Sequence, residues 1–307
     1  MIKYLLHNEI DTKKWDQCIT KSFNSMIYAY SWYLDAVCEQ WDALIEDDYK
    51  RIMPLPTNKK AGISYLFQPN FTQQLGIISQ DKMDSSIVES FLNAIPKKFR
   101  LVEINLNTNN IICESKKHTF IKNSNYELDL IRPYEELYSN YSSNLKRNLK
   151  KAIKNEIKVF PNAKPDDIIK LFRNNRGRDI KTLKEKNYQC LSKLIYLLIH
   201  RGRAQVWGSY NERNELVAGA FFIKSNKKWI FLFSGTAQSA RKNGAMPFLI
   251  DSFIKTNANS NITLDFEGSN DTNLARFYAG FGAKNCSYYG IIRNRLPWIV
   301  KILSGKN

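Results

Sequence analysis

The chain has 307 residues, of which 43% are apolar and 13% aromatic, so it is long enough for two ordinary domains and is not globally disordered. Its net charge of +17 predicts attraction to polyanions: nucleic acid, phosphorylated small molecules or an anionic membrane surface. The charge alone does not choose among these partners. A bias toward Lys, Asn and Ile explains much of the excess equally well.

Cysteine and histidine positions give no support for a disulfide framework or a zinc site. The cysteines are odd in number and scattered, and no histidine lies within helical reach of another ligand. The N-terminus becomes charged before a signal sequence can form, and no apolar run approaches the ~20 residues of a membrane span. We therefore expect a cytoplasmic protein with no metal and no integral membrane segment. The residues concerned are Cys18, Cys38, Cys113, Cys190, Cys286, His7, His118 and His200.

The first half mixes helical and strand patterns. A short strand, Ile2 to Leu6, precedes a helix for which Asp11 and Thr12 are candidate caps. The loop from Gln68 to Ile77 carries Gln73 and Gln74. It has two interpretations: a surface loop whose amides bind the local backbone, or a loop that contacts a substrate.

A domain boundary is expected near Ile131 to Pro133, where proline interrupts a strand pattern and a long helical pattern begins. That helix carries basic residues between its apolar positions, and the basic segment continues from residue 146 to residue 186. The segment either binds RNA or a phosphate-rich ligand, or is a solvated surface. Four strand signals follow: 204–210, 216–223, 229–233 and 262–267.

The last strand opens the most informative stretch, from Ile262 to Gly282. Its apolar residues alternate with polar ones up to Asp265 and Glu267, so both carboxylates are expected on one strand face. Ser269, Asn270 and Asp271 are candidate caps for a helix whose apolar residues recur at helical spacing until Gly282 ends it. The helix carries Tyr278.

A second candidate element precedes the strand. The segment Arg241-Lys242-Asn243-Gly244-Ala245 lies directly before a helix that has Pro247 in its first turn. Backbone N–H groups at a helix start attract anions, small residues let a phosphate approach, and the two cations add charge. Alone, this loop is a weak signal that also fits an ordinary turn.

The order of hairpin strands, R-x-x-G-A loop, helix, LDFEGS strand and N-x-x-x-x-Y helix resembles the GNAT superfamily of N-acyltransferases. The whole chain looks like the FemAB-like group, which has two such domains in tandem. YSSNLKRNLKKAIKNEIKV is similar to that group's basic helix, and WDALIEDDYKRIMPLP with FQPNFTQQLGI resembles its first domain.

The resemblance implies an α/β (α+β) fold of two GNAT-like domains, each a mixed, largely antiparallel sheet flanked by helices. Residues 1–131 would form the acceptor side, without a donor site, and residues 132–307 would hold the donor. The resemblance places the pyrophosphate of acetyl-CoA or another acyl-CoA on Arg241 to Ala245, assigns Asn273 to the same cofactor, and makes Tyr278 the group that protonates the thiolate.

One departure from the group concerns the donor. Members that use aminoacyl-tRNA typically carry Phe-Lys where this chain has Phe277-Tyr278, and their helical arm has no counterpart here. The tyrosine therefore favours acyl-CoA over tRNA.

General chemistry supports the same roles. A phenol of pKa ~10 can protonate a thiolate whose conjugate acid has pKa ~8.5. Glu267 is the preferred base for the acceptor amine, and Asp265 either serves as base or orients the amine. Gln73 and Gln74 are expected to help bind a small-molecule or peptide amine acceptor.

We thus predict direct acyl transfer from acyl-CoA to an amine. Two alternatives stay open: an aminoacyl-tRNA-dependent transferase, and a non-catalytic ligand-binding protein with this fold.

Overall fold

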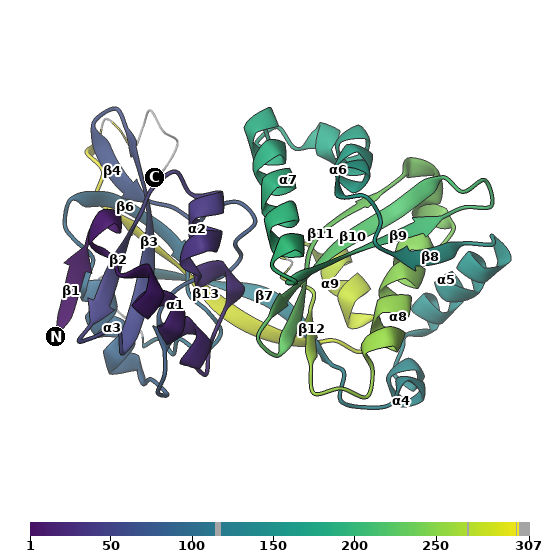
Figure 1. Ribbon diagram of the computed structural model, residues 1–307, viewed down its shortest axis with the longest axis horizontal. Coiled ribbons are helices and arrows are strands. Elements are labelled where there is room, and N and C mark those ends of the chain that lie inside the picture. Colours follow the sequence, from purple (N-terminus) through teal and green to yellow (C-terminus); the bar gives the residue numbers. More distant parts are fainter. Residues whose placement is uncertain (114–117, 269, 299, 301–307) are drawn as a thin grey trace. The chain divides into compact units, whose positions relative to one another are not determined.

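The computed structural model describes residues 1–113, 118–268, 270–298 and 300, and it separates into two compact units (Figure 1). Unit 1 comprises Met1–Asn123 together with the segment that begins at Ser287, and unit 2 comprises Ser124–Cys286. The chain enters unit 2 within one strand, β7 (Thr119–Asp129), and leaves it within another, β13 (Lys284–Asn294). The division expected between residues 131 and 132 therefore falls inside unit 2, and the C-terminal strand belongs mostly to unit 1.

Unit 1 is built on a mixed sheet in the order β1-β2-β3-β4-β6-β13, with β5 paired to β3. All of these pairings are antiparallel except that of β4 with β6. The α-helices among the described residues of unit 1 are α1, α2 and α3. The elements are β1 (Ile2–Leu5), α1 (Thr12–Lys21), α2 (Ser31–Val37), β2 (Trp41–Glu46), β3 (Arg51–Lys60), β4 (Ile63–Leu66), β5 (Ile78–Ser79), α3 (Ser85–Ala94) and β6 (Phe99–Asn105).

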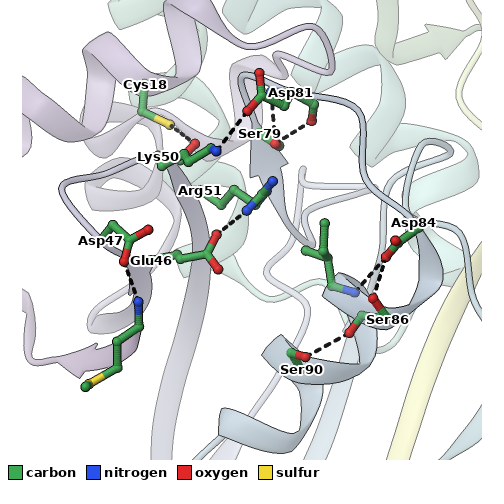
Figure 2. Close-up of polar contacts among 12 residues, drawn as sticks. Cys18, Glu46, Asp47, Lys50, Arg51, Ser79, Asp81, Asp84, Ser86 and Ser90 are labelled. Carbon is green, nitrogen blue, oxygen red and sulfur yellow. Dashed lines mark hydrogen bonds and ion pairs between the residues drawn. The ribbon is translucent and has the colours of Figure 1, made fainter.

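Local sequence signals explain the helix starts of unit 1. The Asp11 side chain accepts hydrogen bonds from the N–H groups of Lys13 and Lys14, as a helix cap does. Asp84 caps α3 in the same way and also accepts a bond from Ser86 (Figure 2). The close-up also shows the ion pair of Arg51 with Glu46, which links neighbouring residues of β3 and β2.

Unit 2 holds a sheet in the order β7-β12-β11-β10-β9-β8, in which only β11 and β12 are parallel. Each unit is therefore a largely antiparallel mixed sheet flanked by helices, as predicted. The elements are α4 (Tyr134–Ser139), α5 (Ser143–Lys154), β8 (Lys158–Pro161), α6 (Pro165–Asn174), α7 (Glu185–His200), β9 (Ala204–Tyr210), β10 (Leu216–Ser225), β11 (Lys228–Thr236), α8 (Ala245–Asn257), β12 (Thr263–Asp265) and α9 (Thr272–Ala279).

Helices cover both faces of the unit 2 sheet. On one face, Phe222 of β10 stacks on Phe253 of α8 with ring centroids 3.6 Å apart. On the other face, Phe233 of β11 meets Phe172 of α6 at 4.6 Å. Phe233 pairs with Phe221, the neighbour of Phe222 on β10, and neighbouring residues of a strand point to opposite faces. Phe222 and Phe233 therefore lie on opposite faces, and so do α8 and α6. Among the described helices of the chain, none is long and apolar enough to cross a membrane.

Candidate functional site

The two parallel strands of unit 2 separate soon after they pair. Lys228 to Ile230 of β11 pair with Thr263 to Asp265 of β12, and there β12 ends while β11 continues to Thr236 (Figure 1). In the described part of the sheet, β12 offers β11 no partner beyond Ile230. The fork between β11 and β12 thus leaves β11 without a described strand partner on this side from Phe231 onward, in the middle of a sheet. An extended ligand can pair with backbone N–H and C=O groups that a neighbouring strand leaves free.

A β-bulge interrupts the pairing of β11 with β10 just after the point where β12 ends. Phe221 of β10 pairs with Phe233 and Phe222 pairs with Phe231, so Leu232 is the extra residue between them. A bulge leaves its extra residue outside the hydrogen-bond ladder and turns the strand locally. Leu232 therefore has no partner residue on β10 in this pairing.

Tyr278 of α9 contacts residues on both sides of the fork. Its ring stacks on Phe266, the residue after β12, at 5.0 Å, and meets Phe231 of β11 at 6.4 Å. The residue is only 8% exposed, and its hydroxyl makes no hydrogen bond to any residue that the structure describes. Burial, followed by the charges of Glu267 and Asp271, raises the pKa of the Tyr278 hydroxyl, which therefore stays protonated at neutral pH.

Glu267 lies beyond the strand on which it was predicted. The segment 262–267 was expected to be extended, yet β12 covers only Thr263–Asp265. The Asp265 carboxylate accepts the N–H of Glu267 at 2.8 Å, and Glu267 takes a left-handed conformation with φ 55°. This local turn ends the alternation, so the expectation that both carboxylates share one strand face was wrong. The negative charge of Glu267 still adds to the effect of burial in raising the pKa of the Tyr278 hydroxyl.

Asp265 is buried, and it belongs to a group of three charged residues that no pattern in the sequence predicted. The other two residues, Lys228 and Glu127, are partly exposed. Lys228 of β11 lies 3.8 Å from Asp265 and makes an ion pair with Glu127 of β7. Burial raises the pKa of Asp265 to about 6, against the opposing effect of Lys228. Burial alone would lower the pKa of Lys228, but the two carboxylates outweigh it and raise that pKa. The three charges come from three strands, so no local pattern reveals the group.

The loop Arg241 to Ala245 connects a 3-10 helix, Gln238–Lys242, to α8. Asn243 accepts the Ala245 N–H at 3.0 Å, so neither group is available to a ligand there. The N–H groups of Gly244 and Met246 bind no described acceptor, and Arg241 and Lys242 are exposed. Gly244 and Met246 are themselves buried residues. Their two N–H groups and the two side-chain cations remain as candidates for anion binding.

Gly244 also has a packing reason. Its φ is +82°, and a Cβ there would lie 2.2 Å from the carbonyl oxygen of Asn148 and 3.2 Å from the nitrogen of Ala152. Both atoms belong to the backbone of α5. A glycine is thus required because α5 packs directly against the start of α8, whether or not a phosphate binds.

The other predicted residues lie apart from this group. Asn273 is exposed in the first turn of α9. Of the three candidate caps for this helix, Asp271 is the one that caps it. Ser269 lies outside the described residues. In unit 1, Gln74 is 1% exposed; its carbonyl accepts the Thr108 N–H and its amide donates to Gln73. The Gln74 amide is therefore occupied within its own loop, whereas Gln73 is partly exposed.

Clefts also lie among the described residues of unit 2. One of about 750 Å³ is lined mainly by β7, α4 and the start of β13, and one of about 510 Å³ lies between α6 and α7. Neither is lined by Tyr278, Glu267 or the loop before α8. In the described residues, no group of three or more His, Cys, Asp or Glu side chains is placed to hold a metal ion.

No protein-family model and no curated protein sequence matches the chain. Solved structures do. FemX has a TM-score of 0.63 at 11% identity, over 98% of this chain and 99% of FemX. A tandem GNAT protein from the clavulanic acid biosynthesis pathway has a TM-score of 0.53 at 9% identity, over 95% of this chain and 98% of its own. A GNAT-family acetyltransferase from Colwellia psychrerythraea has a TM-score of 0.53 at 13% identity, over 96% and 99%.

The predicted fold is thereby confirmed. The chain has the FemAB-like tandem GNAT fold. At these identities the likeness establishes the fold and leaves the reaction to be argued from the site.

Proposed function

We propose that unit 2 is a GNAT-type N-acyltransferase that moves an acyl group from acyl-CoA to an amine. The amine nitrogen attacks the thioester carbonyl carbon, the carbon–sulfur bond breaks, and the products are an amide and free CoA. The proton lost by the amine balances the proton gained by the departing thiolate. No covalent enzyme intermediate is needed, because positioning and proton transfer suffice.

One observation carries the proposal. The fork between β11 and β12 combines unpaired backbone groups with a buried, protonated tyrosine whose hydroxyl has no described partner. An extended thioester arm lying in the fork would bond to the β11 backbone and bring its sulfur toward Tyr278. A tyrosine that only filled the core would need no hydroxyl at this position.

The charge of Glu267 links the two proton transfers. A tyrosine with a raised pKa is a poor acid, and Glu267 is part of the cause. When Glu267 takes a proton from the attacking amine, directly or through water, that charge disappears and Tyr278 becomes more acidic. Burial also penalises a thiolate in the same place, so the phenol–thiol difference returns toward the ordinary ~1.5 pKa units, or ~2 kcal/mol.

The donor's diphosphate would lie at the start of α8, on the N–H groups of Gly244 and Met246 with Arg241 and Lys242 beside them. Each charge–dipole contact supplies only ~0.3–1 kcal/mol at an exposed site, so the affinity requires several together. The roles of Asn273 in donor binding and of Asp265 and Gln73 in acceptor binding stay predictions.

The test compares Tyr278→Phe with Tyr126→Phe. The ring centroids of Tyr126 and Tyr278 are 6.4 Å apart. Tyr126→Phe therefore removes a neighbouring hydroxyl from the same aromatic group. Thiol release from acetyl-CoA is measured with a panel of amines, and CoA affinity by calorimetry. We expect Tyr278→Phe to lower kcat by ~10²-fold or more with little change in CoA affinity, and Tyr126→Phe to have little effect on either. Unchanged turnover in Tyr278→Phe would remove the tyrosine from the mechanism.

A second candidate is the aminoacyl-tRNA-dependent transfer that the resemblance also implies. The observation in its favour is α5, which contains five basic residues and no acidic one. Calorimetry with charged tRNA and with CoA over a salt series separates the two candidates. Steeply salt-dependent tRNA binding without CoA binding would replace our proposal. A non-catalytic protein would instead release no thiol with any amine.

A further inference from the structure

Helix α5 presents an exposed row of cations that the proposed chemistry does not use. Four of its basic residues are exposed, and none forms an ion pair with a carboxylate in the part of the chain that the structure describes. We call this set the α5 basic face. It consists of Arg147, Lys150, Lys151 and Lys154.

This face adjoins the start of α8. Asn148 and Ala152 of α5 are the residues whose backbone atoms touch Gly244, and Lys151 lies in the turn between them. Figure 1 shows α5 and α8 lying side by side. The contact is tight because the buried side of α5, which includes Leu145 and Leu149, belongs to the same core as Ala245 and Leu249 of α8.

Helix geometry places two of the cations on the exposed flank of that contact. Successive residues are about 100° apart around a helix, so Leu145 and Leu149 lie on one side of Asn148. On the other side of Asn148, Lys151 lies about 60° from it around the helix axis and Arg147 lies about 100° from it. Both are therefore beside the start of α8 and point toward solvent, as their exposure requires.

We propose that Lys151 and Arg147 of the α5 basic face bind the 3′-phosphate of coenzyme A. This inference rests on the proposed function, which puts the diphosphate of the donor at the start of α8. In coenzyme A the adenosine continues outward from the diphosphate and carries a separate phosphate on its ribose. Two neighbouring cations with no carboxylate partner match that exposed dianion, since phosphate oxygens accept charge-assisted bonds from Lys and Arg.

A site for the 3′-phosphate would favour donors that carry this phosphate. Acyl carriers that share the diphosphate arm but lack the 3′-phosphate, such as dephospho-CoA thioesters, would bind less tightly. An exposed pair of phosphate contacts predicts a preference of roughly tenfold for CoA at low salt, decreasing as salt screens the charges.

The experiment measures the affinities of CoA and dephospho-CoA by calorimetry for three proteins. These are the wild type, the double variant Arg147→Gln/Lys151→Gln, and a control, Lys193→Gln, which removes one exposed cation from α7. We expect the wild type and the control to prefer CoA by roughly tenfold. In the double variant the affinity for CoA should fall to that for dephospho-CoA. All substituted side chains are exposed, and circular dichroism verifies that the variants remain folded.

The outcomes separate this inference from the proposed function. Equal binding of CoA and dephospho-CoA by the wild type, or a preference that survives in the double variant, overturns the inference while the donor site stands. Failure of both compounds to bind the wild type refutes the proposed donor itself. Tight binding of tRNA that the double variant loses, without discrimination between the two CoA forms, assigns the α5 basic face to RNA and overturns the inference.

Discussion

Replacing Gly244 by alanine separates two explanations for the glycine before α8. If the residue is a glycine only so that a phosphate can approach, Gly244→Ala should weaken CoA binding and leave stability almost unchanged. If α5 requires it, the substitution should destabilise unit 2 without any ligand. The atoms that a new Cβ would meet belong to the backbone of α5, so no side-chain rotation relieves the contact.

The expected loss has two parts. Gly244 has φ +82°, and an alanine held in a left-handed conformation costs about 1–2 kcal/mol. The Cβ would also lie 2.2 Å from the Asn148 oxygen, so α5 must move by about 1 Å to reach ordinary contact. Overpacking of this kind costs about 1–3 kcal/mol, and the total is about 2–5 kcal/mol.

Gly202→Ala is the matched control. Gly202 also has a positive φ, +63°, and belongs to the same unit, but a Cβ there meets nothing within 4 Å. Its substitution should therefore cost only the conformational part, about 1–2 kcal/mol. Hydrogen exchange followed by mass spectrometry, with peptides from α5 and α8, reports the stability of unit 2 separately from that of unit 1. Equal protection in the two variants would refute the packing explanation.

Two further predictions concern stability. Because the pKa of Asp265 is raised to about 6, the folded protein binds more protons than the unfolded chain between pH ~4 and 6, so this group lowers the unfolding free energy as pH rises. Urea unfolding should show Asp265→Asn gaining about 2 kcal/mol relative to the wild type from pH 4 to 7; a constant difference would contradict the shift. In unit 1, buried Asn110 binds both the N–H and the C=O of Ile77, so Asn110→Ala should cost about 2–4 kcal/mol. The exposed Asn93→Ala should cost less than about 0.5 kcal/mol, and similar losses in both would disprove the structural role of Asn110.

Local signals predicted the elements that depend on local chemistry. Asp271, one of the candidate caps, accepts the N–H groups of Asn273 and Leu274 at the start of α9. The helix ends at Ala279 with Gly280 as its C-cap, which is earlier than the expected end at Gly282. The resemblance of the residues from Arg241 to Gly282 to a known family then supplied the fold.

Non-local contacts account for what the sequence concealed. The packing reason for Gly244 comes from Asn148, nearly a hundred residues earlier in the chain. The charged group of Lys228, Glu127 and Asp265 joins three strands, of which β7 begins in unit 1. The return of β13 to unit 1 depends on its pairing with β6, which no pattern within the strand reveals.

Even a local interaction can defeat a periodicity argument. The alternation from Ile262 to Glu267 predicted a strand through Glu267, yet the bond between Asp265 and the Glu267 N–H ends it. Aspartate next to a short strand competes with the ladder for backbone donors.

The most direct test of the proposed function is a crystal structure of the protein with coenzyme A bound. We predict that the diphosphate contacts the N–H groups of Gly244 and Met246, that the arm lies between β11 and β12, and that the sulfur is within hydrogen-bond reach of the Tyr278 hydroxyl. Coenzyme A bound elsewhere in unit 2, with Phe231, Phe266 and Tyr278 still closed around an empty fork, would contradict it.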